Sequence, residues 1–503
     1  MKFGSDVTLQ LVTAIFASAF GSGFQHGYNS GVLNEIQNVT TEWIQRCPEL
    51  DSPNSQCRVS SIEVTWIWAF TVSIFCLGGM VGGLSVGFVA TAIGRRQGLI
   101  ANNLFVFVGA MLMGISKRMD QYSLLIIGRF VIGISAGLAA GLTPMYLSEI
   151  SPESVRGAVG TVYQLVITCS ILLSQILGIE SILGSDTLWP YLLAATAVPA
   201  VVQLLMLPFC PDSPKYCYLD QHNYQSAKQS LIWFRDTHVV EDELQELKAE
   251  EEKAQSEENV TLKDILLKQP LRKHLIIAVM MMLAQQLSGI NAIIFYSTDV
   301  FISSGLSHSS AQYATLGMGA ANVAMTIISI YFIERVGRKT LLSFGMVGML
   351  VSTSLLAACL LVNDHENDTP EAAVGLASYL AVAAVIAFVM FFAIGPGPIP
   401  WFFVSELFAQ SARPIATSIA VGVNWLANFL VSWGFNPLHT FLGSYVFFVF
   451  ITLQLVFIAY IWAYVPETKD KKPGDTSSEY PEEQEEDYNL ASPPTFQPNR
   501  DSV

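Results

Sequence analysis

The chain has 503 residues, of which 52% are apolar and only 13% are charged, whereas about 25% of the residues in an ordinary globular protein are charged. This composition argues against a soluble enzyme, because the chain lacks the polar residues needed to cover several water-soluble cores. The net charge of −15 is concentrated, with 22 of the 67 charged residues in 211–273 and 14 in 466–503, and no basic patch is large enough to bind nucleic acid.

Twelve apolar runs have the length of about 20 residues that a helix needs to cross a bilayer. They begin near Val7, Thr65, Gly98, Tyr122, Gly157, Trp189, His274, Ala311, Thr340, Ala373, Ala416 and Gly443, and we number them spans 1 to 12. Span 1 lacks a small-residue cleavage site, so we interpret it as a retained helix rather than a signal peptide. The sequence therefore predicts an all-α membrane protein with twelve transmembrane helices.

The charged segments divide the chain into four regions. Residues 1–210 form an N-terminal six-helix half, and residues 274–465 form a C-terminal six-helix half. Residues 211–273 are predicted to be a cytoplasmic linker with short helices. Residues 466–503 are rich in Glu, Ser and Pro and are predicted to be a disordered acidic cytoplasmic tail.

Three short motifs of the first half recur in the second half at nearly constant offsets of 243, 257 and 255 residues. The recurring pairs are Gly94-Arg95-Arg96 with Gly337-Arg338-Lys339, Glu149 and Arg156 with Glu406 and Arg413, and Pro211-Asp212-Ser213-Pro214 with Pro466-Glu467-Thr468-Lys469. Two pseudo-symmetric six-helix halves are typical of secondary transporters, which bind substrate between the repeats.

Lysine and arginine in the short connections indicate the orientation. They favour the even-to-odd connections, on the same side as residues 211–273, so that side and both termini are predicted to be cytoplasmic. Asn38 and Asn367 are sequons in predicted outside loops and are expected glycosylation sites. Cys47 and Cys57 share the first outside loop, where a disulfide and two free thiols remain equal alternatives.

The sequence contains no convincing motif for enzymatic chemistry. Gly133-Ile134-Ser135-Ala136-Gly137 matches the G-x-S-x-G nucleophile pattern but lies inside an apolar helix, so we interpret its small residues as a site of close helix packing. The seven cysteines form no CxxC pair and no Cys/His cluster at metal spacing. We expect neither a cofactor nor a metal, and no catalytic residues.

The polar residues left inside the spans are mostly amides. They are Gln164, Gln285, Gln286, Asn291, Asn322, Asn424 and Asn428. An amide both donates and accepts hydrogen bonds, as a sugar hydroxyl does, whereas an ion site calls for carboxylates. Trp401, Trp425 and Phe295 are available to cover the apolar face of a pyranose. The alternative for any single amide is a hydrogen bond that joins two helices.

The paired cytoplasmic motifs suggest an inner gate of arginine and carboxylate groups that bridges the two halves. Its members are Arg95, Arg96, Glu149 and Arg156 in the first half and Glu334, Arg335, Arg338, Glu406 and Arg413 in the second. Static salt bridges combined with the usual charge asymmetry are the alternative. Pro396, Pro398 and Pro400 predict a broken or hinged span 10, for which a static kink is the alternative.

These residues resemble the facilitative sugar transporters (glucose-transporter type) of the major facilitator superfamily, from about Thr8 to Lys469. The matching motifs are Gln25 with Gly27-Tyr28-Asn29, Gly94-Arg95-Arg96, Pro211 to Tyr216, Gln285 to Asn291, Gly395 to Trp401 and Pro466-Glu467-Thr468-Lys469. The resemblance implies passive sugar transport by alternating access without a cofactor. It implies that Gln164, Gln285, Gln286, Asn291, Asn322, Trp401 and Asn428 hold the hexose, with Trp425 beneath it.

Departures from the family pattern bear on the substrate. Met282-Leu283-Ala284 and Ala393 favour fructose acceptance or a divergent lineage, whereas Trp401 is of the glucose type, so D-glucose remains the leading expectation. Thr91 stands where the basic motif of the family carries Asp or Asn, which weakens the gate on that side.

The resemblance also bears on coupling, on partners and on location. Asn29 stands where proton-coupled relatives carry an Asp beside the counterpart of Arg129, which favours a uniporter over a proton-coupled symporter. A transporter-like sugar receptor is the alternative from another class. The expected partners are the hexose, membrane lipid and, through Asp501-Ser502-Val503, a scaffold protein. The expected location is the plasma membrane.

Overall fold

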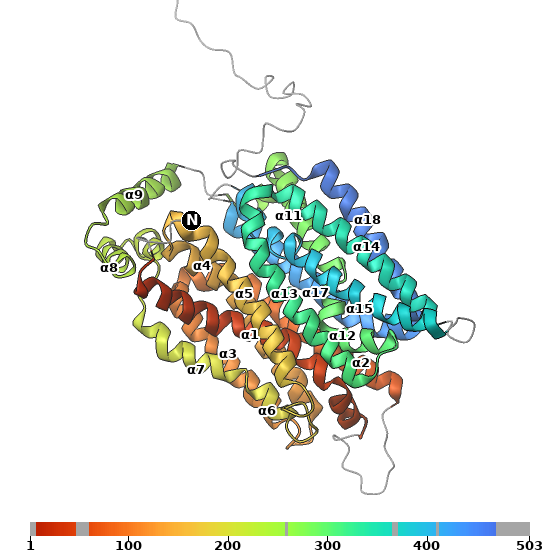
Figure 1. Cartoon of the computed structure of the whole chain (residues 1–503). Helices are drawn as coiled ribbons and strands as arrows, with labels where there is room; N and C mark the ends of the chain where they lie inside the picture. Colours follow the sequence, from red (N-terminus) through yellow and green to blue (C-terminus); the bar gives the residue numbers. More distant parts are fainter. Residues whose placement is uncertain (1–6, 47–59, 257–259, 365–370, 409–411, 469–503) are drawn as a thin grey trace, which may run out of the picture.

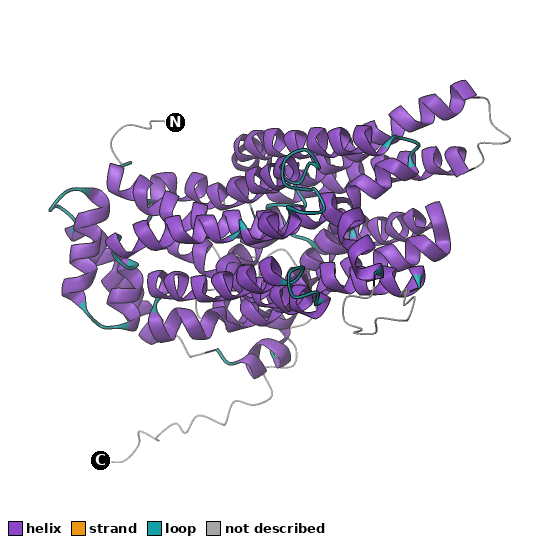
Figure 2. Ribbon diagram, turned by 90° about the horizontal axis from the view of Figure 1, so that it is seen from below, coloured by secondary structure: helices purple, strands orange, loops and turns teal. Residues whose placement is uncertain are grey.

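The computed structural model describes residues 7–46, 60–256, 260–364, 371–408 and 412–468, and these ranges contain helices, turns and loops but no strand (Figure 2). The first six spans are formed by α1 (Leu9–Gln45), α2 (Ser61–Ile93), α3 (Arg95–Ile115), α4 (Tyr122–Ile150), α5 (Glu153–Leu177), α6 (Trp189–Ala194) and α7 (Ala197–Met206). The last six are formed by α11 (Gln269–Leu287), α12 (Ile290–Ser303), α13 (His308–Val336), α14 (Arg338–Asp364), α15 (Glu371–Ile394), α16 (Ile399–Leu407), α17 (Arg413–Leu442) and α18 (Val446–Tyr464).

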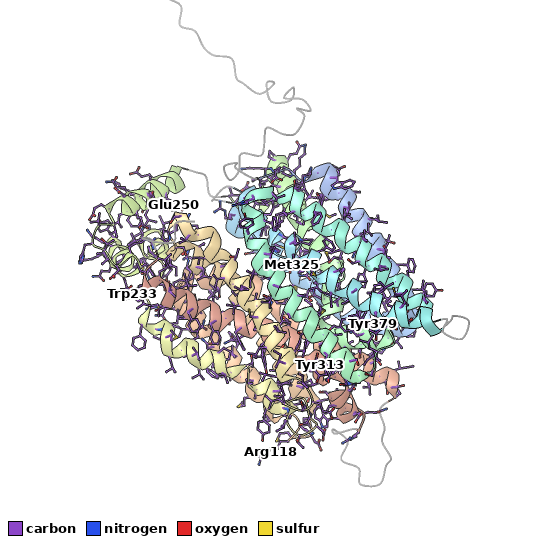
Figure 3. All side chains as sticks on the ribbon, viewed as in Figure 1. Arg118, Trp233, Glu250, Tyr313, Met325 and Tyr379 are labelled. Atoms are coloured by element: carbon purple, nitrogen blue, oxygen red, sulfur yellow. The ribbon has the colours of Figure 1, made fainter. Side chains whose placement is uncertain are left out.

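The prediction of twelve spans is confirmed. Ten described stretches are long and apolar enough to cross a membrane. One of them, Ile415–Tyr464, contains both α17 and α18 and counts as two spans. Span 1, formed by α1, carries more polar residues and brings the total to twelve. Large apolar side chains such as Tyr313 and Tyr379 lie on the outside of the bundle (Figure 3), as expected for helices that face lipid tails rather than water.

The two halves lie side by side in Figure 1 and contact each other mainly along three helix pairs. These pairs are α2 with α17, α5 with α13, and α1 with α12. We call the end of the bundle where α1 ends at Gln45 and α2 begins at Ser61 the outer end. The opposite end, which carries α8 (Tyr224–Arg235), α9 (Glu241–Ser256) and α10 (Leu262–Leu267), is the inner end.

Small residues bring α2 and α4 into direct backbone contact, as their sequence predicts. A Cβ atom on Gly133 would overlap the carbonyl oxygen of Phe75, and one on Gly137 would overlap the carbonyl oxygen of Gly79. Close approach of this kind lets dispersion forces act between backbones, which is the main source of helix association inside a membrane. The G-x-S-x-G match is therefore a packing feature of a helix.

Three spans are broken rather than continuous. The proline-rich segment separates α15, which ends at Ile394, from α16, which begins at Ile399, and this break is the one that the sequence predicts. Span 7 is also broken, at Ser288 and Gly289 between α11 and α12, and span 6 is broken between α6 and α7. The break in span 7 places the amide-rich end of α11 next to the first turn of α12.

Candidate functional site

Four amide side chains form one buried hydrogen-bond network inside the second half. Gln286 donates from Nε2 to Asn424 Oδ1 at 2.8 Å, and Asn424 donates from Nδ2 to Gln285 Oε1 at 2.7 Å. Asn291, in the first turn of α12, donates to Gln286 Oε1. The network thus joins α11, α12 and α17, and amides of this kind present the donors and acceptors that a polyhydroxyl ligand requires.

Gln285 also holds the break in span 10. Its Nε2 donates to the carbonyl oxygens of Pro396 at 3.0 Å and Gly397 at 2.6 Å. These carbonyls lie between α15 and α16, where helix hydrogen bonds are interrupted. The amide network and the proline-rich break are therefore one physical unit, a connection that the sequence does not predict.

Asn428 and Trp425 lie on α17, against the first half. Asn428 Oδ1 accepts hydrogen bonds from Cys76 Sγ on α2 at 3.2 Å and from Ser432 Oγ at 3.0 Å. Trp425 is only 2% exposed, and its ring lies 5.3 Å from the ring of His26 on α1. In this structure α1 and α2 of the first half cover the indole of Trp425, which belongs to the second half.

Three of the predicted sugar-binding residues lie apart from the amide network. Gln164 is half-buried on α5, Asn322 is buried on α13, and Trp401 is half-buried in the first turn of α16. Within the described chain none of their side chains hydrogen-bonds to the four-amide network. A bound ligand would be needed to connect these three side chains to the amide network.

Arg129 is buried in the first half without a carboxylate partner among the described residues. Its guanidinium donates to the backbone carbonyls of Asn29 at 2.9 Å and Val72 at 3.4 Å and lies 4.6 Å from the centre of the Phe75 ring. The Asn29 side chain turns to Thr196, with Nδ2 at 2.7 Å from Thr196 Oγ1. The predicted proximity of Asn29 and Arg129 is present, through the backbone rather than the amide.

At the inner end of the first half, Arg95 is the centre of a charge cluster. Its Nε lies 3.0 Å from Glu149 on α4, and its Nη1 lies 2.5 Å from Asp220. The guanidinium also lies 5.1 Å from the centre of the Tyr216 ring. Arg95 and Glu149 are only 13% and 11% exposed, so the pair is largely shielded from solvent.

The second half repeats this cluster. Arg338 Nη2 lies 3.1 Å from Glu406 Oε1 on α16, and Thr468 donates to the same carboxylate. Arg338 Nη1 donates to the carbonyl of Ile333 at 3.2 Å, five residues earlier, as Arg95 donates to the carbonyl of the residue five before it at 3.3 Å. The duplicated motifs therefore have duplicated geometry.

A carboxylate closes the start of α3 and of α14. Asp212 accepts from the backbone amide of Arg96 at 3.2 Å, and Glu467 accepts from the backbone amide of Arg338 at 2.8 Å. Carboxylates are favourable at helix N-termini because the first amides lack partners and the helix dipole is positive there. The recurring Pro-Asp and Pro-Glu motifs thus serve as remote helix caps.

Glycine is required immediately before each of these helices. Gly94 and Gly337 have φ angles of 88° and 105°, in the region that side chains disfavour. A Cβ atom would also lie 2.8 Å from Asp212 Oδ2 in the first case and 2.8 Å from Glu467 Oε2 in the second. Only glycine therefore fits at the first position of each Gly-Arg motif, because of the positive φ angle and the close carboxylate cap.

The expected bridging of the two halves by these ion pairs is not what the structure shows. Arg95 pairs with Glu149 inside the first half, and Arg338 pairs with Glu406 inside the second. The reason is that the arginine at the start of α3 or α14 faces the neighbouring helix of its own repeat, a geometry that repeats with the duplication. A role in gating stays a prediction.

The other predicted gate residues lie around these clusters. Arg96 Nη1 donates to the carbonyl of Cys210 at 2.6 Å, and Arg335 stacks on the ring of Tyr331 at 4.0 Å. Arg156 is exposed. Glu334 lies in α13, but its side chain falls outside the described part of the structure.

Arg413, a predicted gate residue of the second half, interacts electrostatically with the linker. Burial lowers the pKa of Arg413, and the Glu250 carboxylate on α9 opposes this shift. Glu250 also pairs with Lys215 at 2.6 Å. Glu250 on the linker helix α9 therefore interacts with Lys215, within the linker, and with Arg413 of the second half.

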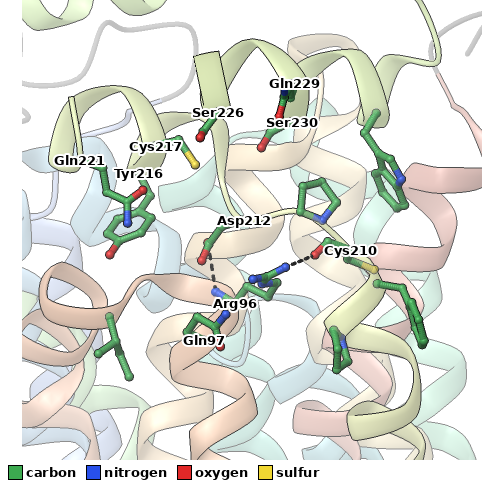
Figure 4. Close-up of a pocket in the computed structure, with 15 residues that line it drawn as sticks. Arg96, Gln97, Cys210, Asp212, Tyr216, Cys217, Gln221, Ser226, Gln229 and Ser230 are labelled. Atoms are coloured by element: carbon green, nitrogen blue, oxygen red, sulfur yellow. Dashed lines mark hydrogen bonds between the residues drawn. The ribbon is translucent and has the colours of Figure 1, made fainter. Parts of the chain in front are cut away.

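Two pockets open at the inner end of the first half. The larger, of about 470 Å³, lies between α3 and α8 (Figure 4) and is lined by Arg96, Asp212 and Trp233 among others. Burial raises the pKa of the Cys210 thiol in this pocket to about 11, so the thiol is neutral at physiological pH. The second pocket, of about 320 Å³, is lined by Arg156, Glu149 and residues of α9.

The outer end holds a polar latch that the sequence does not reveal. Asn34 Nδ2 on α1 lies 3.0 Å from both Ser297 Oγ and Thr298 Oγ1 on α12, and Gln37 Nε2 lies 2.5 Å from Asp299 Oδ2. We call these five residues the outer latch. They connect the two halves directly, and only the packing of α1 on α12 brings them together.

Several predictions fall at the edge of the described chain. Asn38 is exposed near the outer end, but it lies inside α1 rather than in a loop, and the Thr40 side chain of its sequon is buried. Asn367, Cys47, Cys57 and residues 469–503 lie outside the described residues. Among the residues that are described, no group of three His, Cys, Asp or Glu residues has the geometry of a metal site.

Comparisons with known proteins agree with this architecture. The chain is 40% identical over 476 residues to the facilitated glucose transporter member 1 of Gallus gallus, covering 94% of this chain and 93% of that protein. It is 42% identical over 470 residues to member 4 of Mus musculus, covering 92% and 89%.

Among solved structures, the proton:xylose symporter XylE bound to 6-bromo-6-deoxy-D-glucose matches with a TM-score of 0.76 at 24% identity, covering 92% of this chain and 98% of that one. This likeness shows the major facilitator fold. The family model for "Sugar (and other) transporter" matches residues 14–476. The chain therefore belongs to the sugar transporter family.

Proposed function

We propose that this chain is a uniporter that carries a hexose, D-glucose foremost, down its gradient by alternating access. The observation that carries the proposal is the buried amide network of Gln285, Gln286, Asn291 and Asn424, which offers neutral donors and acceptors and contains no carboxylate. Relatives that are 40–42% identical over more than nine tenths of the chain are named facilitated glucose transporters.

Eight residues are proposed to contact the sugar. Gln285, Gln286, Asn291 and Asn428 present amides from α11, α12 and α17, and Gln164 approaches from α5 on the opposite half. The others are Asn322, Trp401 and Trp425. A sugar that hydrogen-bonds to Gln285 competes with the carbonyls of the break in span 10, which links occupancy of the site to the shape of α16.

The outer latch is proposed to act as a gate, and the inner charge clusters are proposed to keep each half rigid while the halves move. The outer latch joins α1 to α12, and its closed geometry supports a state that is shut toward the outer end. The inner charge clusters centred on Arg95 and Arg338 hold each repeat as a rigid unit. Motion between halves then breaks contacts between α1 and α12 while contacts within each half persist.

Proton coupling is disfavoured by the surroundings of Arg129. A coupled carrier needs a group beside the substrate path that takes up and releases a proton, and Asn29 is an amide. The two terminal nitrogens of the Arg129 guanidinium donate to backbone carbonyls, and no carboxylate pairs with it among the described residues. We place the protein in the plasma membrane with both termini in the cytoplasm, N-glycosylated at Asn38 and Asn367.

Uptake of labelled D-glucose into proteoliposomes tests the proposal, with fructose and L-glucose as competitors and with and without an imposed pH gradient. Saturable, stereospecific entry that stops at equal concentrations supports uniport. Stronger competition by fructose than by unlabelled glucose would identify fructose as the preferred substrate, in keeping with Met282-Leu283-Ala284. Accumulation driven by the pH gradient would refute uniport, and binding without entry would indicate a receptor.

The variant Asn29→Asp supplies the converse test. It puts a carboxylate on the residue whose backbone carbonyl accepts a hydrogen bond from Arg129, so transport is expected to become sensitive to pH in the variant through this site. Asn29→Leu, which alters the same position without adding a titratable group, is the matched control. If Asn29→Asp leaves the pH profile of wild-type transport unchanged, the argument from this pair of residues fails.

A further inference from the structure

Glu35 is a buried carboxylate beside the outer latch. It lies on α1 between two latch residues and is only 6% exposed. Its Oε1 accepts from Asn34 Nδ2 at 3.1 Å and from Thr298 Oγ1 at 3.4 Å. Its Oε2 is buried and accepts no hydrogen bond of normal geometry within the described chain, although Gln312 on α13 faces the carboxylate.

No cation compensates Glu35 among the described residues. The titratable and charged groups at this end of the elements around α1 are Glu63 on α2, Lys117, Arg118 and Asp120 at the α3–α4 turn, Tyr122 at the start of α4, Glu180 and Asp186 between α5 and α6, Tyr191 on α6, Tyr296 and Asp299 on α12, and His308 and Tyr313 on α13, with Glu42 and Arg46 on α1 itself. Lys117 pairs with Asp186, and Arg46 pairs with Glu42. Arg118 is exposed and points away from the bundle (Figure 3).

Asp299, the carboxyl group of the latch, supplies no positive charge to Glu35. It stands next to Thr298 on α12 and accepts a hydrogen bond from Gln37. A carboxylate that is buried without a cation is more stable when it is neutral. The closed contact between α1 and α12 therefore favours a proton on Glu35.

We propose that closure of the outer latch turns Glu35 into a proton-binding site, so that protons from the outer solution stabilise the closed form. The proposal rests on alternating access and adds a ligand, the proton, to the outer gate. When α1 separates from α12, water reaches Glu35 and the proton leaves. Water delivers the proton to Glu35 Oε2 before closure and receives it again after opening.

This proton performs no transport work. It enters from and returns to the same outer solution, because the site opens only toward that side. By reciprocity, the factor by which closure favours protonation is the factor by which protonation favours closure. One proton shifts the ratio of closed to open forms by at most about tenfold per pH unit, and it causes no accumulation of sugar.

Distances between spin labels on the two sides of the latch test the proposal. Asn38→Cys on α1 and Ile302→Cys on α12 place labels on exposed positions of the two halves, in a full-length chain whose exposed native cysteines are replaced by serine. Measurements are made in proteoliposomes between pH 8 and pH 5.5, by double electron–electron resonance. We expect the short-distance population of the otherwise wild-type chain to grow as the pH falls.

Glu35→Gln replaces the carboxylate with a neutral group of nearly the same shape. It is expected to hold the short-distance population at all pH values. Glu180→Gln, an exposed carboxylate at the same end, is the matched control and should keep the wild-type response. Glu35→Ala provides a second neutral variant if the amide disturbs folding, and it is likewise expected to abolish the pH response.

Two results would overturn the proposal. One is a pH response in both neutral variants of Glu35 equal to that of the control. The other is loss of the response in Asp299→Asn with retention in Glu35→Gln, which would assign the proton to Asp299. Failure of D-glucose uptake in the separate transport assay bears on the proposed function and leaves the distance measurement interpretable.

Discussion

The most informative perturbation is Gln285→Leu. The change keeps nearly the same side-chain volume but removes two donors and one acceptor from a buried site. Three groups then lose their partner: the carbonyls of Pro396 and Gly397 and the amide of Asn424. Leaving a buried polar group unsatisfied costs about 1–3 kcal/mol, so the lower limit for three groups is about 3 kcal/mol.

Thermal unfolding of the purified protein in detergent, followed by tryptophan fluorescence, measures this loss. The unfolding entropy is about 2.1 cal/mol/K per residue, so in a chain of 503 residues a change of about 3 kcal/mol corresponds to a fall of about 3 °C in the unfolding midpoint. D-Glucose should raise the midpoint of the wild type and should raise that of the variant less, because one of the proposed sugar contacts is absent.

Gln164→Leu is the matched control for stability. Gln164 is half-buried and makes no hydrogen bond within the described chain, so its replacement should change stability by no more than about 0.5 kcal/mol. It is nevertheless expected to weaken stabilisation by D-glucose. If the two variants unfold at the same temperature, Gln285 does not hold the break in span 10, and the coupling between the amide network and α16 is refuted.

Three further predictions concern the scaffold. Arg95→Gln should lower the unfolding midpoint more than Arg338→Gln, because the Arg95 pair is less exposed and a carboxylate left buried without its partner is strongly destabilising; equal midpoints would contradict this ranking. Gly137→Leu should prevent folded expression, measured by size-exclusion profile, while Gly160→Leu, where a Cβ atom meets nothing within 4 Å, should be tolerated. Hydrogen bonds in its capping box lower the pKa of Asp264 to about 2. The stability that ionised Asp264 gives to α10 is therefore complete above its ordinary pKa near 4 and is lost as the pH falls toward 2. Hydrogen exchange of α10 should differ between wild type and Asp264→Asn at pH 6 but not at pH 2.

Much of the fold follows from the sequence alone. Apolar runs of membrane-spanning length, separated by charged connections, determine the number of helices because backbone groups inside lipid must be satisfied within each helix. The break in span 10 follows from the prolines at 396, 398 and 400, since proline removes the amide donor that a helix needs. The duplicated motifs indicate the two halves, because the cap formed by Asp212 recurs as that formed by Glu467.

The partners within the site are decided by tertiary structure. The sequence shows that Gln285 lies in an apolar run, but not that its amide holds the carbonyls of a distant break. It suggests that Arg95 pairs with a carboxylate, but not that the partner is Glu149 of the same half. A hydrogen bond or ion pair is specific to the atoms that packing brings within about 3 Å, and composition carries no such distance.

The outer end shows the same division most clearly. Glu35 and Thr298 are 263 positions apart in the chain, and neither stands out in a helix that also contains many other polar residues. They come into contact only when α1 packs on α12, which removes water from the carboxylate and leaves it without a cation. Sequence determined which side chains are available to this protein, and the packing of one half on the other decided which of them lost their solvent, because desolvation depends on neighbours in space.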